Sequence, residues 1–142
     1  YDTRYRSIQQ MYQALKAKEF GDLKAYTMIM QAASPRTQTD IGSTINSYDP
    51  EIWGAKADSV MERAVRLKFA QNVEERKFLL DTGDAVILFA KKYQPHWGTG
   101  LAMSDDANGD VTKWLGKNVL GNLLVKIREE IKYDQQYNNN HA

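Results

Sequence analysis

Only one segment of this chain has the pattern of a β-strand, and that shortage limits the folds open to it. Residues 85–90 read Ala-Val-Ile-Leu-Phe-Ala, a short apolar run with β-branched side chains. A lone strand leaves backbone N–H and C=O groups unpaired along its edges. We therefore expect partner strands from residues 1–6, from a segment outside this sequence or from another chain. The expected fold class is α+β, predominantly helical, with a small sheet.

Most of the remaining chain follows the apolar spacing of helices. The expected helices cover residues 8–20, 22–33, 50–71, 74–80 and 120–131. The third has the strongest start, because Asp49 can accept a backbone hydrogen bond and Pro50 suits the first helical position. Residues 34–48 are weakly patterned and could hold a short helix around Gln38.

The length of 142 residues fits a single domain with one core, which we expect at residues 1–134. Residues 135–142 are polar and rich in Asn, so we expect a disordered tail there. The chain starts without Met and shows no signal peptide or membrane-length apolar run. We therefore expect an intracellular, cytoplasmic protein or part of a larger assembly, processed or excerpted from a longer chain.

Composition excludes several classes of function. The chain has 19 basic and 18 acidic residues, and this balance does not favour bulk binding of nucleic acid. With no Cys and two His, the chain lacks a thiol nucleophile, a thiolate metal site and a multi-histidine site. The acidic loop 105–110 lacks the flanking helices and the distal Glu of a calcium loop. We expect no metal, no cofactor and no membrane partner. The composition does not exclude a local pocket that binds a phosphate.

The loop after the apolar run combines aromatic rings with glycines. Trp97 offers a flat surface on which a base or ring could stack, and Gly98 lets the backbone approach a ligand. The alternative is a loop that a buried Trp97 anchors. His96 could act as a general acid–base group or only form structural hydrogen bonds.

A Gly-Lys-Asn step at residues 116–118 precedes the last expected helix. Backbone N–H groups at a helix start, together with the Lys117 cation, could bind an anion. The step is not a phosphate-cradling loop, because it lacks the leading glycine and the Ser or Thr after Lys. The alternative is a helix cap, with Gly121 allowing close packing.

Four blocks of the sequence, taken in order, resemble the NADAR family, which is also called the YbiA-like family. The blocks are residues 5–16, 53–72, 79–100 and 116–128. They include a Tyr-x-Ser helix with Tyr12-Gln13 and Lys16, a helix with Trp53, a Trp97-Gly98 pair and a Gly-x-Asn-x-Leu-Gly start of the last helix. The resemblance implies a NADAR/YbiA-like single domain.

The resemblance also implies an activity and a site. Members of the family resemble N-glycosidases that hydrolyse ribose–nitrogen bonds in riboflavin-pathway intermediates or in ADP-ribosylated guanine bases. The implied catalytic positions are Gln9, Trp53 and Gln94. The implied ligand-binding residues are Tyr12, Gln13, Lys16, Trp97, Gly98, Gly116, Lys117 and Asn118.

Several departures from the family pattern bear on this activity. Gln9 stands where the family carries a Glu, and Gln94 stands where it usually carries an Asp. The step at residues 42–43 is Gly-Ser in place of Gly-Arg, so a phosphate-binding Arg is missing. The family's Ser-Asn-Phe type segment does not precede Tyr1. Glycosidic cleavage passes through an oxocarbenium-like state, which a carboxylate stabilises and a neutral amide does not.

We therefore expect a catalytically weak or inactive module. It would bind a nucleotide or an ADP-ribose-like small molecule, or serve as a structural or interaction part of an assembly with other protein chains or the rest of a longer chain. The alternative is an active N-glycosidase in which an acid elsewhere, such as Glu19 or Asp81, has taken over the chemistry.

Overall fold

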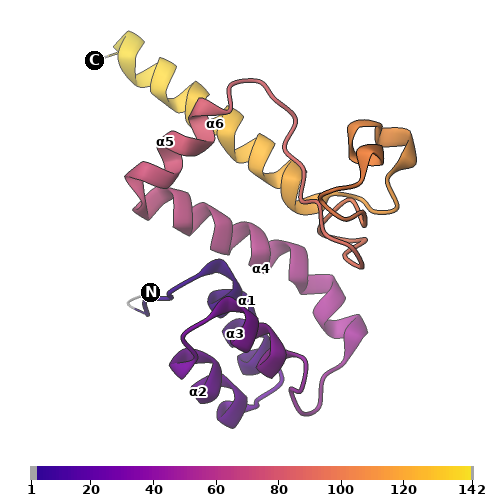
Figure 1. The fold of residues 1–142 in the computed structure, drawn as a ribbon. Helices are drawn as coiled ribbons and strands as arrows, with labels where there is room; N and C mark the ends of the chain where they lie inside the picture. Colours follow the sequence, from indigo (N-terminus) through magenta and orange to yellow (C-terminus); the bar gives the residue numbers. More distant parts are fainter. Residues whose placement is uncertain (1–2, 142) are drawn as a thin grey trace. The chain divides into compact units, whose positions relative to one another are not determined.

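The computed structural model describes residues 3–141, in which helices are the main elements (Figure 1). The elements in chain order are α1 (Ile8–Glu19), α2 (Leu23–Gln31), α3 (Pro35–Gly42), α4 (Pro50–Gln71), α5 (Val73–Asp81), the 3₁₀ turns η1 (Asp106–Gly109) and η2 (Val111–Lys113), and α6 (Val119–His141). The chain divides into two compact units, the first ending at Asn72 and the second beginning at Val73. Among the described residues, no helix has both the length and the apolar character that crossing a membrane requires.

Polar side chains set where the helices of the first unit begin. Each of four N-cap residues accepts a hydrogen bond from a backbone N–H two or three residues further on. These residues are Ser7, Asp22, Ser34 and Asp49. Pro35 and Pro50 occupy the first helical position of α3 and α4, where the missing N–H has no helical partner to lose. The helix start predicted at Asp49 is confirmed.

The first unit is built around α1, which packs against α2, α3 and α4 (Figure 1). Its core cluster contains three buried alanines and two isoleucines: Ala14, Ala17, Ala25, Ile29 and Ile45. The small alanine side chains on α1 let the neighbouring helices approach closely. Because α1 is surrounded in this way, its polar side chains are also brought against other helices.

Two buried glutamines close the C-terminal end of α2. The Nε2 atom of Gln10 donates to the carbonyl of Ile29 (3.2 Å), and that of Gln38 donates to the carbonyl of Ala32 (3.0 Å). The Ser7 hydroxyl donates to the side-chain oxygen of Gln38 (2.8 Å). Carbonyls at a helix C-terminus have no partners within the helix, so these amides satisfy groups that would otherwise be buried unpaired.

In the second unit, the apolar segment 85–90 is not a strand. The predicted small sheet, and with it the α+β class, is wrong, because residues 3–141 contain helices, turns and irregular segments but no strand. Within that range, the structure has one isolated parallel bridge, between Lys92 and Gly100. A run of β-branched residues favours an extended backbone, but a strand also needs a neighbouring strand to pair with.

The side chain of Asn118 takes the place of such a neighbour. Its Oδ1 atom accepts from the backbone N–H of Phe89 (2.9 Å), and its Nδ2 atom donates to the carbonyl of Ile87 (2.9 Å). Asn118 is 0% exposed, so both bonds form away from water. Its φ of +50° lies in the left-handed region, where Asn is enriched relative to most residues. The side-chain amide of Asn118 thus forms the two hydrogen bonds that one peptide group of a partner strand would form.

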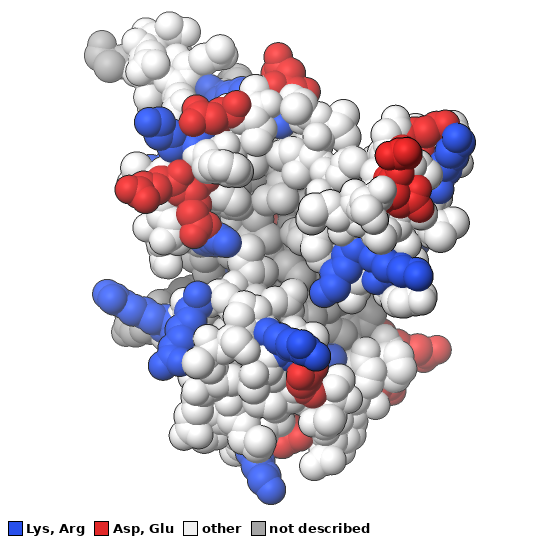
Figure 2. All heavy atoms as spheres, viewed as in Figure 1, with Lys and Arg blue, Asp and Glu red and all other residues white. Residues whose placement is uncertain are grey.

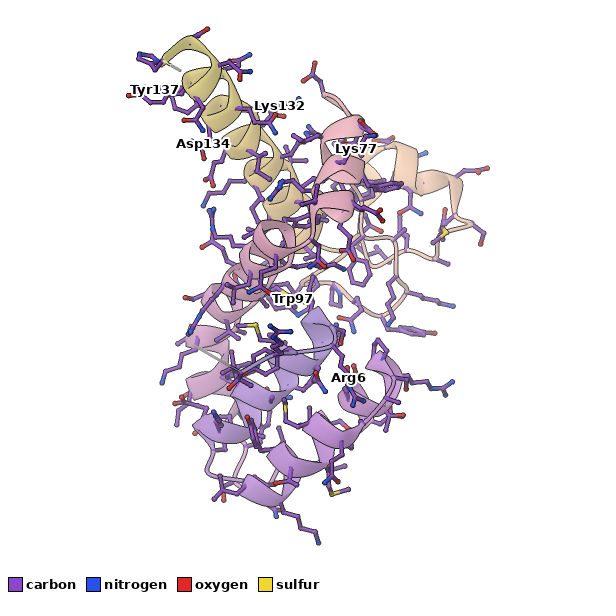
Figure 3. All side chains as sticks on the ribbon, turned by 90° about the vertical axis from the view of Figure 1, so that its left-hand side faces the viewer. Arg6, Lys77, Trp97, Lys132, Asp134 and Tyr137 are labelled. Carbon is purple, nitrogen blue, oxygen red and sulfur yellow. The ribbon has the colours of Figure 1, made fainter. Side chains whose placement is uncertain are left out.

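A buried arginine on α6 holds the beginning of the same segment. The Nη1 atom of Arg128 donates to the carbonyl of Ala85 (2.7 Å) and to the hydroxyl of Thr82 (3.0 Å). Its Nε atom donates to Glu129 (3.0 Å), which supplies the compensating charge. The helix then continues to His141, through residues that the sequence predicted to be a disordered tail. The side chains of Lys132, Asp134 and Tyr137 mark this C-terminal part of α6 (Figure 3).

Replacing Asn118 with Ala should lower the free energy of unfolding by about 3–5 kcal/mol. The change leaves two buried backbone groups unpaired, at roughly 1–3 kcal/mol each, and places a Cβ-bearing residue without a polar side chain at a positive φ. Urea unfolding measures the loss. The control is Asn122→Ala on the exposed face of α6, for which we expect a change within about 0.5 kcal/mol. Equal losses in the two variants would contradict the role assigned to Asn118.

Candidate functional site

The predicted site residues fall into two groups, one in each unit. Gln9, Tyr12, Gln13, Lys16 and Trp53 belong to the first unit, and Gln94, Trp97, Gly98, Gly116, Lys117 and Asn118 to the second. Within the described residues, no group of three or more His, Asp or Glu side chains is arranged to hold a metal ion.

In the first unit, polar side chains of α1 meet α3 and the segment that follows it. The Thr39 hydroxyl donates to the side-chain oxygen of Gln9 (3.3 Å). About two helical turns further along α1, the Nζ atom of Lys16 donates to the carbonyl of Gly42 (3.1 Å). The same ammonium lies 4.6 Å from the centre of the Tyr48 ring, within the range of a cation–π contact. Gln9 and Lys16 are therefore placed by the packing of α1 against α3.

Gln13 lies between these two positions on α1, and its side chain is buried without a complete set of partners. The residue is 6% exposed, and its Oε1 atom has no hydrogen-bond partner among the described residues. A Cβ atom on Gly42 would lie 1.9 Å from this oxygen, so only glycine at position 42 leaves room for the amide. An unpaired buried acceptor costs roughly 1–3 kcal/mol, so this oxygen is a polar group that the packing of the first unit leaves unsatisfied.

The charge of Lys16 is also incompletely compensated. Burial lowers the pKa of the Lys16 ammonium below its usual value of 10.5, because loss of water disfavours the charged form. Its described contacts, a carbonyl oxygen and an aromatic face, are neutral. Positions 9, 13 and 16 thus offer an ammonium that can bind an anion and an amide oxygen that can accept from an N–H or O–H donor. We call Gln9, Gln13 and Lys16 the α1 polar cluster.

Two other predicted residues of this unit are buried against each other. Trp53 is 4% exposed and donates its indole N–H to the Tyr12 hydroxyl (2.9 Å). The two rings meet edge to face, with centroids 5.3 Å apart and planes at 67°. This pair pins α1 to α4 next to the α1 polar cluster. A direct role of Trp53 or Tyr12 in ligand binding stays a prediction.

In the second unit, loop carbonyls cap the start of α6. Four consecutive backbone N–H groups, from Lys117 to Leu120, donate to carbonyls of residues 95–98. The pairs are Lys117 with Pro95 (2.7 Å), Asn118 with Gly98 (2.9 Å), Val119 with His96 (3.1 Å) and Leu120 with Trp97 (3.0 Å). The sequence analysis predicted that backbone N–H groups at this helix start could bind an anion. In the structure, the N–H groups from Lys117 to Leu120 bond to carbonyls of the protein itself, as in a helix cap. Anion binding by the exposed Lys117 side chain stays a prediction.

The glycines of this region bring two backbones together. A Cβ atom on Gly116 would lie 2.3 Å from the carbonyl oxygen of Gly98, and the Gly98 N–H donates to the carbonyl of Gln94 (3.0 Å). Trp97, which Figure 3 labels, is half-buried, and its ring meets His96 edge to face with centroids 4.6 Å apart. Close packing thus accounts for both glycines, and stacking of a ligand on Trp97 stays a prediction.

The sequence analysis did not predict three residues that contact the α1 polar cluster. Thr39 and Tyr48 lie in a stretch with weak periodicity, and Gly42 drew notice only for the residue that follows it. Their meeting with α1 depends on how α3 packs, which local sequence does not encode. Most of the face in Figure 2 is white, and the Lys and Arg side chains and the Asp and Glu side chains are scattered over it in small groups.

Comparisons with known proteins agree with the sequence motifs. The NADAR domain family matches residues 1–132. An N-glycosidase of Acanthamoeba polyphaga mimivirus is 36% identical over 126 residues, which cover 89% of this chain and 74% of the relative. The N-glycosidase YbiA of Escherichia coli is 29% identical over 120 residues, covering 84% of this chain and 68% of the relative. The NMR structure of E. coli YbiA matches with a TM-score of 0.71 at 28% identity, over 91% of this chain and 68% of that one.

Replacing Gln13 with Met should leave the free energy of unfolding unchanged or raise it by about 1 kcal/mol. The substitution removes a buried acceptor that has no partner and keeps the shape of the side chain. The matched control is Gln10→Met on the same helix, whose amide bonds two carbonyls and whose loss should cost about 2–4 kcal/mol. Thermal unfolding of both variants tests this contrast, and a large loss in Gln13→Met would show that its oxygen has a partner.

The contribution of Lys16 to stability should depend on pH. Since the folded chain holds the Lys16 proton less tightly than the unfolded chain, unfolding free energy rises with pH between the lowered folded-state pKa and the unfolded value of about 10.5. Below this window the penalty is fully present. Lys16→Met removes the penalty, so the difference between the two proteins should change across the window. A difference independent of pH from 7 to 11 would contradict the burial of a charged Lys16.

Proposed function

Because this chain belongs to the NADAR domain family, we propose that it binds a nucleotide or an ADP-ribose-like ligand and has weak or no N-glycosidase activity. The observation that carries the proposal is the amide at position 9. Gln9 lies on α1 where the family pattern has a Glu, and its side-chain oxygen accepts from the Thr39 hydroxyl. An amide is nearly the same shape as a carboxylic acid, so the arrangement of the neighbouring side chains can persist while the charge is lost.

The lost charge is the one that the chemistry needs. A carboxylate stabilises an oxocarbenium-like state or takes a proton from the attacking water, and a neutral amide does neither well. The second departure, Gln94 in the second unit, is of the same kind. Two separate acid-to-amide differences fit a diverged member better than a single altered position.

The rest of the α1 polar cluster supports retained binding. Lys16 carries a partly buried charge with neutral partners, and Gln13 carries a buried oxygen without one. The phosphate of a nucleotide would supply the missing anion, and a ribose hydroxyl or an exocyclic amine would supply the missing donor. Gly42 admits the Gln13 amide and turns its own carbonyl to Lys16, so both features depend on one local packing arrangement.

A second candidate function is an active N-glycosidase. It is favoured by the name of the mimivirus relative, which is 36% identical over 89% of this chain. This function requires an acid at another position. Of the two sequence candidates, Glu19 at the end of α1 forms an ion pair with Lys56 (2.5 Å), and Asp81 lies in the second unit at the end of α5.

Calorimetric titration with ADP-ribose and NAD, combined with assays for released base, separates these functions. The assays would incubate NAD and ADP-ribosylated guanosine with the unmodified chain and with a Gln9→Glu, Gln94→Asp double variant. We expect binding without release for the unmodified chain and release by the double variant. Release by the unmodified chain would favour the active N-glycosidase. Absence of both binding and release would favour a structural module that keeps only the fold.

Two lysines on α1 provide a matched pair for the binding assay. Lys16 lies 4.6 Å from the Tyr48 ring and Lys18 lies 4.8 Å from the Tyr26 ring, so both make a similar aromatic contact. Lys16→Met should weaken ligand binding at least about tenfold, which corresponds to roughly 1.4 kcal/mol. Lys18→Met, outside the α1 polar cluster, should leave the affinity unchanged. Equal effects would remove the cluster from the binding site.

A further inference from the structure

The segment between α3 and α4 supplies two contacts of the Lys16 ammonium. Gly42, the last residue of α3, accepts from it at 3.1 Å, and the ring of Tyr48, just before the N-cap of α4, lies 4.6 Å away. A lysine ammonium is carried by a flexible four-carbon stem and can turn its three donors in many directions. Contacts on two sides confine it, so the position of this segment decides where Lys16 can meet an anion.

The backbone of this segment makes a sharp turn just before Tyr48. Ser47 has a φ of +61°, in the left-handed region that non-glycine residues seldom occupy. Such a conformation costs free energy and persists only where the surrounding contacts hold it. The turn therefore needs an anchor on each side. On its C-terminal side the anchor is the start of α4, which the Asp49 side chain caps.

The anchor on the N-terminal side is the carboxylate of Asp22. Its Oδ2 atom accepts from the backbone N–H of Asn46 (2.9 Å), and its Oδ1 atom accepts from the N–H of Ala25 (3.0 Å) as the N-cap of α2. The hydrogen bonds from Ala25 and Asn46 hold the pKa of Asp22 below its usual value, because they favour the charged carboxylate. One side chain thus ties the start of α2 to the segment that carries Tyr48.

We propose that Asp22 is a positioning residue for Lys16 and acts through the Tyr48 ring. This inference rests on the proposed function, in which Lys16 binds the phosphate of the ligand. By holding Asn46, the carboxylate keeps the ring beside the ammonium, and Phe20 meets the same ring edge to face with centroids 5.4 Å apart. An ammonium that is already held in its binding position loses less freedom when the anion binds.

Asp22→Asn separates this role from helix capping. Asn caps helices about as well as Asp, so we expect α2 to keep its start. An amide has one acceptor oxygen, however, and cannot serve the N–H groups of both Ala25 and Asn46. The variant should therefore release Asn46 and, with it, the Tyr48 ring.

The matched control is Asp49→Asn. One oxygen of Asp49, its Oδ1 atom, accepts from the N–H groups of both Glu51 and Ile52, so an amide can keep both bonds. The control removes the same charge at a position adjacent to Tyr48 in sequence. The comparison of the two variants therefore isolates the loss of the bond to Asn46.

NMR signals of the Lys16 side chain report the contact without any ligand. Protons over the face of an aromatic ring are shifted upfield, so the protons next to the Lys16 nitrogen should show this shift. We expect Tyr48→Leu to abolish the shift, Asp22→Asn to reduce it strongly and Asp49→Asn to leave it unchanged. Adding Asp22→Asn to Tyr48→Leu should change nothing further, because a residue that acts through another has no effect once that other is removed.

Calorimetric titration with ADP-ribose measures the consequence for binding. Asp22→Asn should bind about three- to tenfold more weakly than the unmodified chain, because Lys16 is less well preorganised, and Asp49→Asn should bind equally well. An unchanged Lys16 signal in Asp22→Asn would overturn the proposal, as would equal effects of the two Asn variants. If the unmodified chain does not bind ADP-ribose, the proposed function fails, whereas a ring shift lost in Asp22→Asn and kept in Asp49→Asn would still support the positioning.

Discussion

The second unit depends on one buried amide. Asn118 immediately precedes α6 and has a positive φ. Its side chain bonds the backbone of Ile87 and Phe89, so it joins the start of the helix to the segment 85–90. A Cβ atom on Gly121 would lie 2.2 Å from the carbonyl of Ile87, which shows how close the helix and the segment are. If this amide were lost, the carbonyl of Ile87 and the N–H of Phe89 would both lose their hydrogen-bond partner.

The first unit uses the same chemical group in two different ways. Gln10 is fully bonded: its amide nitrogen donates to carbonyls at the end of α2, and its oxygen accepts from the backbone of Arg6. Gln13, one turn later on the same helix, has a buried oxygen without a partner. A satisfied amide stabilises a fold, whereas an unsatisfied one lowers stability and has to be explained by another role. By this contrast, Gln10 belongs to the structural support of the first unit, and Gln13 belongs to the candidate site.

Much of the helical architecture was predictable, because caps and apolar spacing are local signals. Asp49 and Pro50 correctly predicted the start of α4. The order of the sequence motifs indicated the NADAR family, and the family comparison assigns the chain to the same family. The predicted sheet was wrong for a non-local reason. Residues 85–90 have strand-like side chains, but their partner is a side chain 29 and 31 residues away in sequence. No local pattern distinguishes an edge paired with a strand from one paired with an amide.

Local sequence therefore decides which segments become helices, where they begin and which residue types stand at the family positions, including the amides Gln9 and Gln94. These properties depend on neighbours within a few residues. Tertiary packing decides that Lys16 meets the carbonyl of Gly42, that the Gln13 oxygen is buried without a partner among residues 3–141, and that residues 87 and 89 bond to the Asn118 side chain. Burial and hydrogen-bond partners are properties of assembled helices, because they arise only when segments distant in sequence come into contact.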